Sequence, residues 1–184
     1  MTVLKNIAIF VAWALGAAVG VSFLLPAHWE VQREVRIQAE PRDVHRVLAD
    51  LETWEVWSPW GLMVDARVTT NAGSSTLTWS GPEVGSGAVV VTAAEPAGGL
   101  WFDLDLRGDP VKGVFQYQRD DGGATDVRWT LRAEAGSNPL GRYRALFRRY
   151  TVGPEVVSAL TRLKSRVERG AGAGGYARRT SGRA

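Results

Sequence analysis

The stretch "LWFDLDLRGDPVKGVFQYQRDDGGATDVRWTLRAEA", residues 100–135, decides the fold. It holds three runs in which apolar and polar residues alternate, and the runs are separated by the turn sequences "RGDP" and "RDDGG". Alternation with a period of two is typical of strands that bury one face. Short turns join antiparallel neighbours, so the stretch predicts an antiparallel meander.

Further strands are predicted on the N-terminal side. The runs "DARVTT" (65–70), "TLTWS" (76–80) and "AVVVTAAE" (88–95) also end in turn residues, and "VQREVRIQA" (31–39) alternates in the same way. Together they make about seven strands. The segment "EPRDVHRVLADLETW" (40–54) has a proline near its start and helical apolar spacing, which predicts a short helix from Pro41.

After the last strand the apolar period becomes helical. We predict a long C-terminal helix from Pro139, with a kink or short break at Pro154, because proline lacks an amide donor and clashes with the preceding turn. One apolar stripe on this helix is predicted to consist of Leu140, Tyr143, Leu146, Phe147, Val156, Leu160, Leu163 and Val167. The predicted fold class is α+β, a curved antiparallel sheet wrapped around the long helix.

The first 27 residues form a separate segment. Residues 7–25, "IAIFVAWALGAAVGVSFLL", carry no charge and would span about 28 Å as a helix, close to the thickness of a bilayer core. We predict a single-pass anchor, with a cleaved signal peptide as the alternative. Gly16 and Gly20 are spaced to allow close helix packing, which makes an anchor-mediated homodimer a hypothesis. Basic residues flank the segment on both sides, so charge assigns no side of the membrane.

The remaining chain divides into a folded domain, residues 28–169, and a glycine-rich basic tail, residues 170–184, predicted to be unstructured. From Pro139 onward eleven Lys and Arg residues face two acids, a net of +9 within a whole-chain charge of +3. Such a split is typical either of a solvated helix face with a basic tail or of contact with an anionic surface.

Three segments resemble one known superfamily. They are "WEVQREVRIQAEPRDVHRVLADLETWEVWSPW" (29–60), "GPEVGSGAVVVTAAEP" (81–96) and "NPLGRYRALFRRYTVGPEVVSALTRLK" (138–164). The chain resembles the SRPBCC superfamily over roughly residues 30–168, and in particular its small membrane-anchored bacterial members. This superfamily has the helix-grip fold of START lipid-transfer domains and polyketide cyclase/dehydrase-like proteins. The resemblance implies a cavity between sheet and long helix. Arg148, Arg149 and Tyr150 stand where the family is more apolar, which indicates a more basic helix.

The tryptophan cluster Trp54, Trp57 and Trp60 lies at the rim of that cavity in the resembling fold. Strand alternation sends every second side chain to the same face, and side chains there serve either as plain core or as a cavity wall. A base-stacking platform is disfavoured because acids flank the cluster, and no nucleic acid is expected. The residues predicted to line a ligand cavity are Trp57, Trp60, Trp79, Val89, Val91, Phe102, Leu104, Phe115, Tyr117, Trp129, Tyr143 and Phe147.

The sequence shows no catalytic constellation. Cysteine is absent, and the two histidines, His28 and His45, are not in a metal-ligand spacing. Asp103 and Asp105 are predicted to face solvent, because their strand neighbours are apolar. We therefore expect no metal and no cofactor.

The function predicted first is binding of a hydrophobic or amphipathic small molecule, such as a lipid, isoprenoid or polyketide-like compound, by a membrane-tethered domain. One alternative is a cyclase or dehydrase acting through Tyr117 or Tyr143. The other is a non-catalytic module at the membrane surface, whose basic helix and tail contact anionic lipid or a partner protein.

Overall fold

The computed structural model describes residues 2–59, 67–71, 74–80, 85–96, 98–106, 108–136 and 138–180. Predicted positions 60–66, including Trp60, lie outside these residues. The elements in chain order are α1 (Thr2–Ser22), β1 (His28–Ile37), α2 (Pro41–Ala49), the 3-10 helix η1 (Leu51–Thr53), α3 (Trp54–Trp57), β2 (Arg67–Asn71), β3 (Ser74–Trp79), β4 (Gly87–Glu95), β5 (Gly99–Leu106), β6 (Asp109–Arg119), β7 (Thr125–Glu134) and α4 (Pro139–Thr180).

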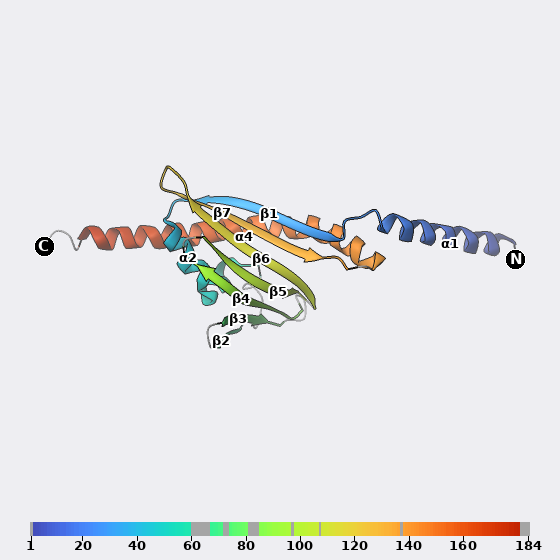
Figure 1. The fold of residues 1–184 in the computed structure, drawn as a ribbon, viewed down its shortest axis with the longest axis horizontal. Helices are drawn as coiled ribbons and strands as arrows, with labels where there is room; N and C mark the ends of the chain where they lie inside the picture. Colours follow the sequence, from blue (N-terminus) through green and yellow to red (C-terminus); the bar gives the residue numbers. More distant parts are fainter. Residues whose placement is uncertain are drawn as a thin grey trace.

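The strands form one seven-stranded antiparallel sheet in the order β1-β7-β6-β5-β4-β3-β2 (Figure 1). Strands β2 to β7 follow each other as a meander, which confirms the prediction from residues 100–135. The first strand, β1, pairs with the last strand, β7, from His28 opposite Glu134 to Ile37 opposite Thr125. This pairing places the N-terminal part of the domain beside its C-terminal part.

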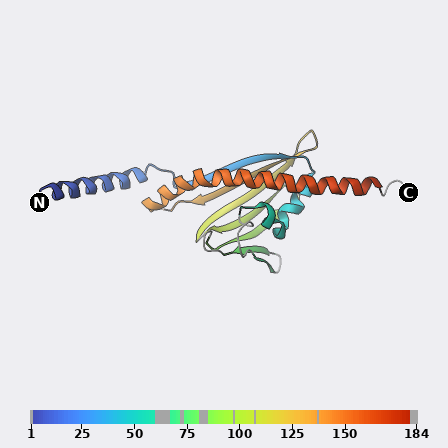
Figure 2. The same ribbon diagram turned by 180° about the vertical axis from the view of Figure 1, so that it is seen from behind.

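Helix α4 crosses one face of the curved sheet, and the short helices α2 and α3 close that face near the middle of α4 (Figure 2). The buried core lies between these layers. On β7 it takes every second residue, Val127, Trp129, Leu131 and Ala133, while the residues between them are exposed or half-buried. The observed architecture is the predicted helix-grip arrangement.

The predicted apolar stripe on α4 is correct only in its second half. Val156, Leu160, Leu163 and Val167 are buried, whereas Leu140, Tyr143, Leu146 and Phe147 are exposed. In the first turns, α4 turns small residues toward the end of the sheet instead. A Cβ at Gly141 would lie 2.2 Å from the Ala135 carbonyl oxygen, and Ala145 is buried. The close approach needs small side chains, so the large ones lie on the opposite face.

Two further predictions for α4 differ from the structure. The helix runs through Pro154 without a break, and the Pro154 carbonyl accepts a hydrogen bond from the Ser158 hydroxyl at 3.0 Å. The helix also continues to Thr180, over most of the tail predicted to be unstructured. Extending a formed helix adds one hydrogen bond for each residue that is fixed, without a new nucleation cost, and this favours continuation into a segment that has little to bury.

Two glycines in the sheet make room for aromatic rings on the neighbouring strand. Gly113 of β6 lies opposite Phe102 of β5, and a Cβ built at Gly113 would come within 2.1 Å of the Phe102 ring. Gly87 of β4 lies opposite Trp79 of β3, where the corresponding distance is 2.2 Å. The rings therefore occupy the space that a side chain at each glycine would take.

Replacing Gly113 by alanine is expected to lower the free energy of unfolding by about 1–3 kcal/mol, because the buried Phe102 ring has to move within a packed core. Gly170→Ala is the matched control, since Gly170 is an exposed helical position with nothing within 4 Å of an added Cβ. That variant should keep the wild-type stability or gain up to about 1 kcal/mol. Denaturant unfolding followed by tryptophan fluorescence measures both, and equal midpoints for the two variants would contradict the argument.

Candidate functional site

A cluster of five aromatic rings fills the space between the sheet and the helices. Trp54 and Trp57 come from α3, Phe102 from β5, Phe115 from β6 and Trp129 from β7, and all five are fully buried. Neighbouring ring centroids are 4.7 to 6.2 Å apart, in tilted or edge-to-face arrangements. These are the separations that aromatic pairs prefer, and they make one continuous apolar interior.

Side chain to backbone hydrogen bonds fix the two tryptophans of α3. The Trp54 indole Nε1 donates to the Leu48 carbonyl of α2 at 2.9 Å, and the Arg162 Nε of α4 donates to the Trp57 carbonyl at 3.0 Å. The Asp50 side chain accepts from the Glu52 amide and starts the turn. Segment 50–57 is thus tied both to α2 and to α4.

Most of the predicted cavity residues lie in this interior. Eight of the twelve are buried: Trp57, Trp79, Val89, Phe102, Leu104, Phe115, Tyr117 and Trp129. Val91 is half-buried. Tyr143 and Phe147 were predicted to face the sheet, and this is wrong: they lie on the outer face of α4 with exposed fractions of 37% and 69%. That these residues line a ligand cavity stays a prediction.

A polar contact that the sequence analysis did not find lies beside this interior. The His45 Nδ1 of α2 is 2.5 Å from the Tyr117 hydroxyl of β6, and that hydroxyl donates to the Glu95 carbonyl at 2.8 Å. Tyr117 is buried and His45 is half-buried. Three elements that are distant in sequence therefore meet at one hydroxyl group.

The hydrogen count determines the tautomer of His45. The tyrosine hydroxyl has one proton, which it gives to the Glu95 carbonyl, so His45 must donate from Nδ1 to the hydroxyl oxygen. The neutral imidazole then keeps its lone pair on Nε2. Burial lowers the pKa of His45 from 6.5, which favours this neutral form. Burial, together with the charge of Glu95, raises the pKa of Tyr117 to about 12 and keeps the phenol protonated.

We expect His45 to make stability depend on pH below 6.5. Because its pKa is lower in the folded state, the unfolded chain binds more protons in the window just below 6.5, and stability falls as the pH drops through it. His45→Gln should remove this part of the pH dependence, while His28→Gln should keep it. Burial raises the pKa of Glu155, which acts in the opposite direction, but Glu155 is present in all three proteins.

Unfolding midpoints of the wild type and the two variants at about pH 7.5 and about pH 5 make the comparison. The same change of midpoint with pH in all three proteins would show that His45 does not titrate differently on folding.

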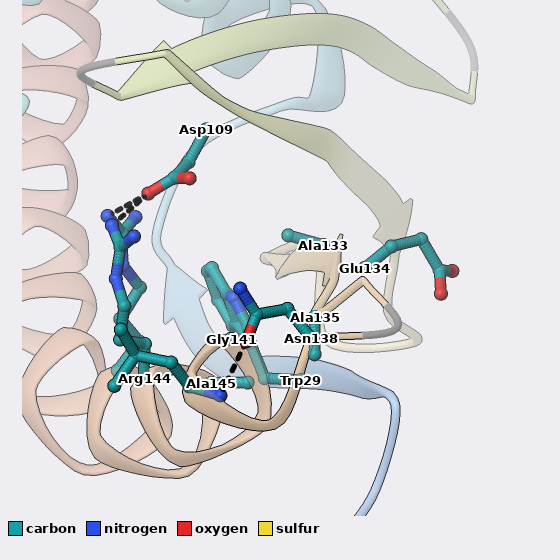
Figure 3. Close-up of a pocket in the computed structure, with 11 residues that line it drawn as sticks. Trp29, Asp109, Ala133, Glu134, Ala135, Asn138, Gly141, Arg144 and Ala145 are labelled. Carbon is teal, nitrogen blue, oxygen red and sulfur yellow. Dashed lines mark hydrogen bonds and ion pairs between the residues drawn. The ribbon is translucent and has the colours of Figure 1, made fainter.

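A surface pocket of about 230 Å³ lies where the first turns of α4 meet the ends of the sheet (Figure 3). Asp109 at the start of β6 binds two arginines of α4, Arg144 at 2.8 Å and Arg148. The Asn138 side chain accepts from the Leu140 amide at 2.9 Å and caps the helix. The side wall is formed by Trp29, which is almost fully buried. The pocket is polar and open, unlike the aromatic interior.

The acidic side chains of β5 point to the surface of the sheet. Asp103 pairs with Lys112 at 2.9 Å, and the Asp105 side chain accepts from the Gly108 amide at 2.6 Å, so both aspartates point away from the core as predicted. Among the described residues, no group of three His, Cys, Asp or Glu side chains is placed to hold a metal ion. His45 and Tyr117 are titratable groups at the border of the interior, and their contact joins α2 to β6.

Comparison with known proteins identifies the fold. A family model described as "Polyketide cyclase / dehydrase and lipid transport" matches residues 28–168. A search of curated proteins finds no match. The match covers the sheet, the short helices and most of α4, and it leaves out α1.

Solved structures agree with this match. The Zhui aromatase/cyclase from a Streptomyces species superposes with a TM-score of 0.60 at 16% identity, over 77% of this chain and 94% of that chain. A protein from Thermus thermophilus gives 0.57 at 22% identity, over 77% and 99%. A START superfamily protein from Mycobacterium smegmatis gives 0.55 at 15% identity, over 76% and 97%. At these identities the likeness concerns the fold, and it confirms the resemblance inferred from the sequence.

Proposed function

Because the chain belongs to the polyketide cyclase/dehydrase and lipid transport family, we propose that its domain binds an apolar, ring-containing or lipid-like small molecule while α1 tethers it to a membrane. The observation that carries the proposal is the cluster of five buried rings between the sheet and the helices. Burial of apolar ligand surface against these rings supplies the binding free energy, at about 25 cal/mol per Å².

Access to the rings requires movement of the segment 50–57. The rings already contact one another, so a ligand has to displace part of the cluster. Segment 50–57 is the proposed moving part, since it is short and its two tryptophans lie against the rings of the sheet. Its opening breaks its hydrogen bonds to α2 and α4. Its displacement exposes Phe115 and Trp129 on the sheet.

The character of α1 supports the tether. Residues 3–22 have a mean hydropathy of 1.8, and residues 3–21 are exposed, whereas Ser22 at the end of the helix is buried. A helix that is apolar on every face and exposed along most of its length loses stability in water, and a bilayer core covers such a helix. Figure 1 shows α1 leading away from the domain at the end where α4 begins.

A second candidate function is catalysis of the cyclase or dehydrase type, which the contact between His45 and Tyr117 favours. A neutral imidazole with a free lone pair on Nε2 is able to accept a proton from a bound substrate, and the hydroxyl of Tyr117 holds the imidazole in that tautomer. Loss of turnover in His45→Gln with unchanged ligand binding would support this candidate over simple binding.

The test is native mass spectrometry of the full chain taken from its host membranes in nanodiscs, compared with a denatured sample. We expect an additional mass that is lost on denaturation. In Trp57→Leu the occupancy should fall by about tenfold, since one indole–ligand contact contributes on the order of 1–2 kcal/mol.

The control is Trp101→Leu, which removes an indole from the outer side of β5, next to Phe102 in sequence. It should leave the occupancy unchanged. A wild-type protein that carries no additional mass, or equal occupancy in the two variants, would contradict binding at the aromatic cluster.

A further inference from the structure

The first three turns of α4, residues 139–150, present an unusual outer face. It carries five large apolar side chains, Leu140, Tyr143, Leu146, Phe147 and Tyr150, with exposed fractions of 66%, 37%, 37%, 69% and 72%. At roughly 100° per residue they share one side of the helix, opposite Gly141 and Ala145. We call these five residues the outer apolar face. A solvated helix face carries polar side chains here, so this face requires a covering partner.

Arginines border the outer apolar face on both sides. Arg142 and Arg149 lie along one border and Arg144 and Arg148 along the other, by the same helical spacing. Asp109 neutralises one charge of the second pair. Four arginines against one aspartate leave an excess of three positive charges. An apolar stripe with basic borders is the pattern of helices that lie in the headgroup region of a bilayer.

The end of α1 fixes where this face lies. The Tyr143 hydroxyl donates to the Ala18 carbonyl at 2.7 Å, and Arg142 donates to the carbonyls of Phe23 and Leu25 at 3.1 and 2.9 Å. The Arg142 guanidinium also lies 5.5 Å from the centre of the Phe23 ring. Ala18 is within the apolar span of α1. A bilayer crossed by α1 therefore ends at the level of the first turns of α4.

We propose that the outer apolar face of α4 is a second membrane-contacting surface, which inserts Leu140, Tyr143 and Phe147 into the headgroup region of an anionic leaflet while the bordering arginines bind lipid phosphates. The inference rests on the proposed membrane anchoring by α1. Tyrosine is favoured at this depth, because its ring is apolar and its hydroxyl is polar. Contact with the leaflet covers the exposed rings and holds the domain in one orientation.

The experiment uses the full chain, whose sequence contains no cysteine, so that single cysteines report one site each. Leu140→Cys, Phe147→Cys and Val157→Cys are labelled with an environment-sensitive fluorophore and reconstituted into phosphatidylcholine vesicles containing one part in about four of phosphatidylglycerol. Val157 is the control, an exposed position on α4 about 25 Å beyond Leu140. Val11→Cys, in α1, reports anchoring.

We expect quenching by iodide to be about threefold or more weaker at positions 140 and 147 than at 157, and lipid-borne nitroxide to quench in the reverse order. The fluorophore at position 140 should lie deeper in the bilayer than the one at 147, since Leu140 is closer to the end of α1. Arg149→Glu, combined with Phe147→Cys, should reduce immersion in the anionic vesicles and leave it unchanged in pure phosphatidylcholine.

Three outcomes overturn the inference, and the experiment distinguishes them from one another. If lipid nitroxide quenches at position 11 but not at 140 or 147, α1 is an anchor and the outer apolar face does not bind lipid. Protection of position 147 from both quenchers would mean that a second protein copy covers the face. If position 11 is not quenched by lipid either, the anchoring on which the inference rests fails as well.

Discussion

The pairing of β1 with β7 is the contact on which the other parts of the molecule depend. It joins the first strand of the domain to the last along ten residue pairs, and it places β1 where α4 packs against it. Without it β7 would be an edge strand of the sheet, and the start of α4 would not lie beside the end of α1. The order of the sheet thus determines both the shape of the interior and its position relative to the N-terminal helix.

The interior combines large aromatic rings with glycine positions that leave room for them. Phe102 and Trp79 lie over glycines of the neighbouring strands, so the sheet accommodates large aromatic groups without bending away from them. The five central rings contact one another at favourable angles. Under the proposed ligand binding, the cost of opening this interior lies in moving segment 50–57 and not in the paired strands.

Patterns of period two and of local turns were visible in the sequence, and the strands were predicted from them. The buried side of the first turns of α4 was predicted wrongly. Gly141 and Ala145 mark that side by being small, whereas the large apolar residues lie on the opposite side. The His45–Tyr117 contact joins residues 72 positions apart. No local pattern encodes such a distance, so only the packing of α2 on the sheet brings the two together.

The short connection between α1 and β1 limits how far the domain can lie from α1. Only residues 23–27 separate Ser22 from His28, and a chain of this length spans at most roughly 20 Å. Arg142 holds two of its carbonyls, which shortens the reach further. With α1 in a bilayer, as proposed, so short a tether keeps the domain within roughly 20 Å of the membrane surface. Under the proposed function, a ligand then passes from lipid to protein without crossing much water.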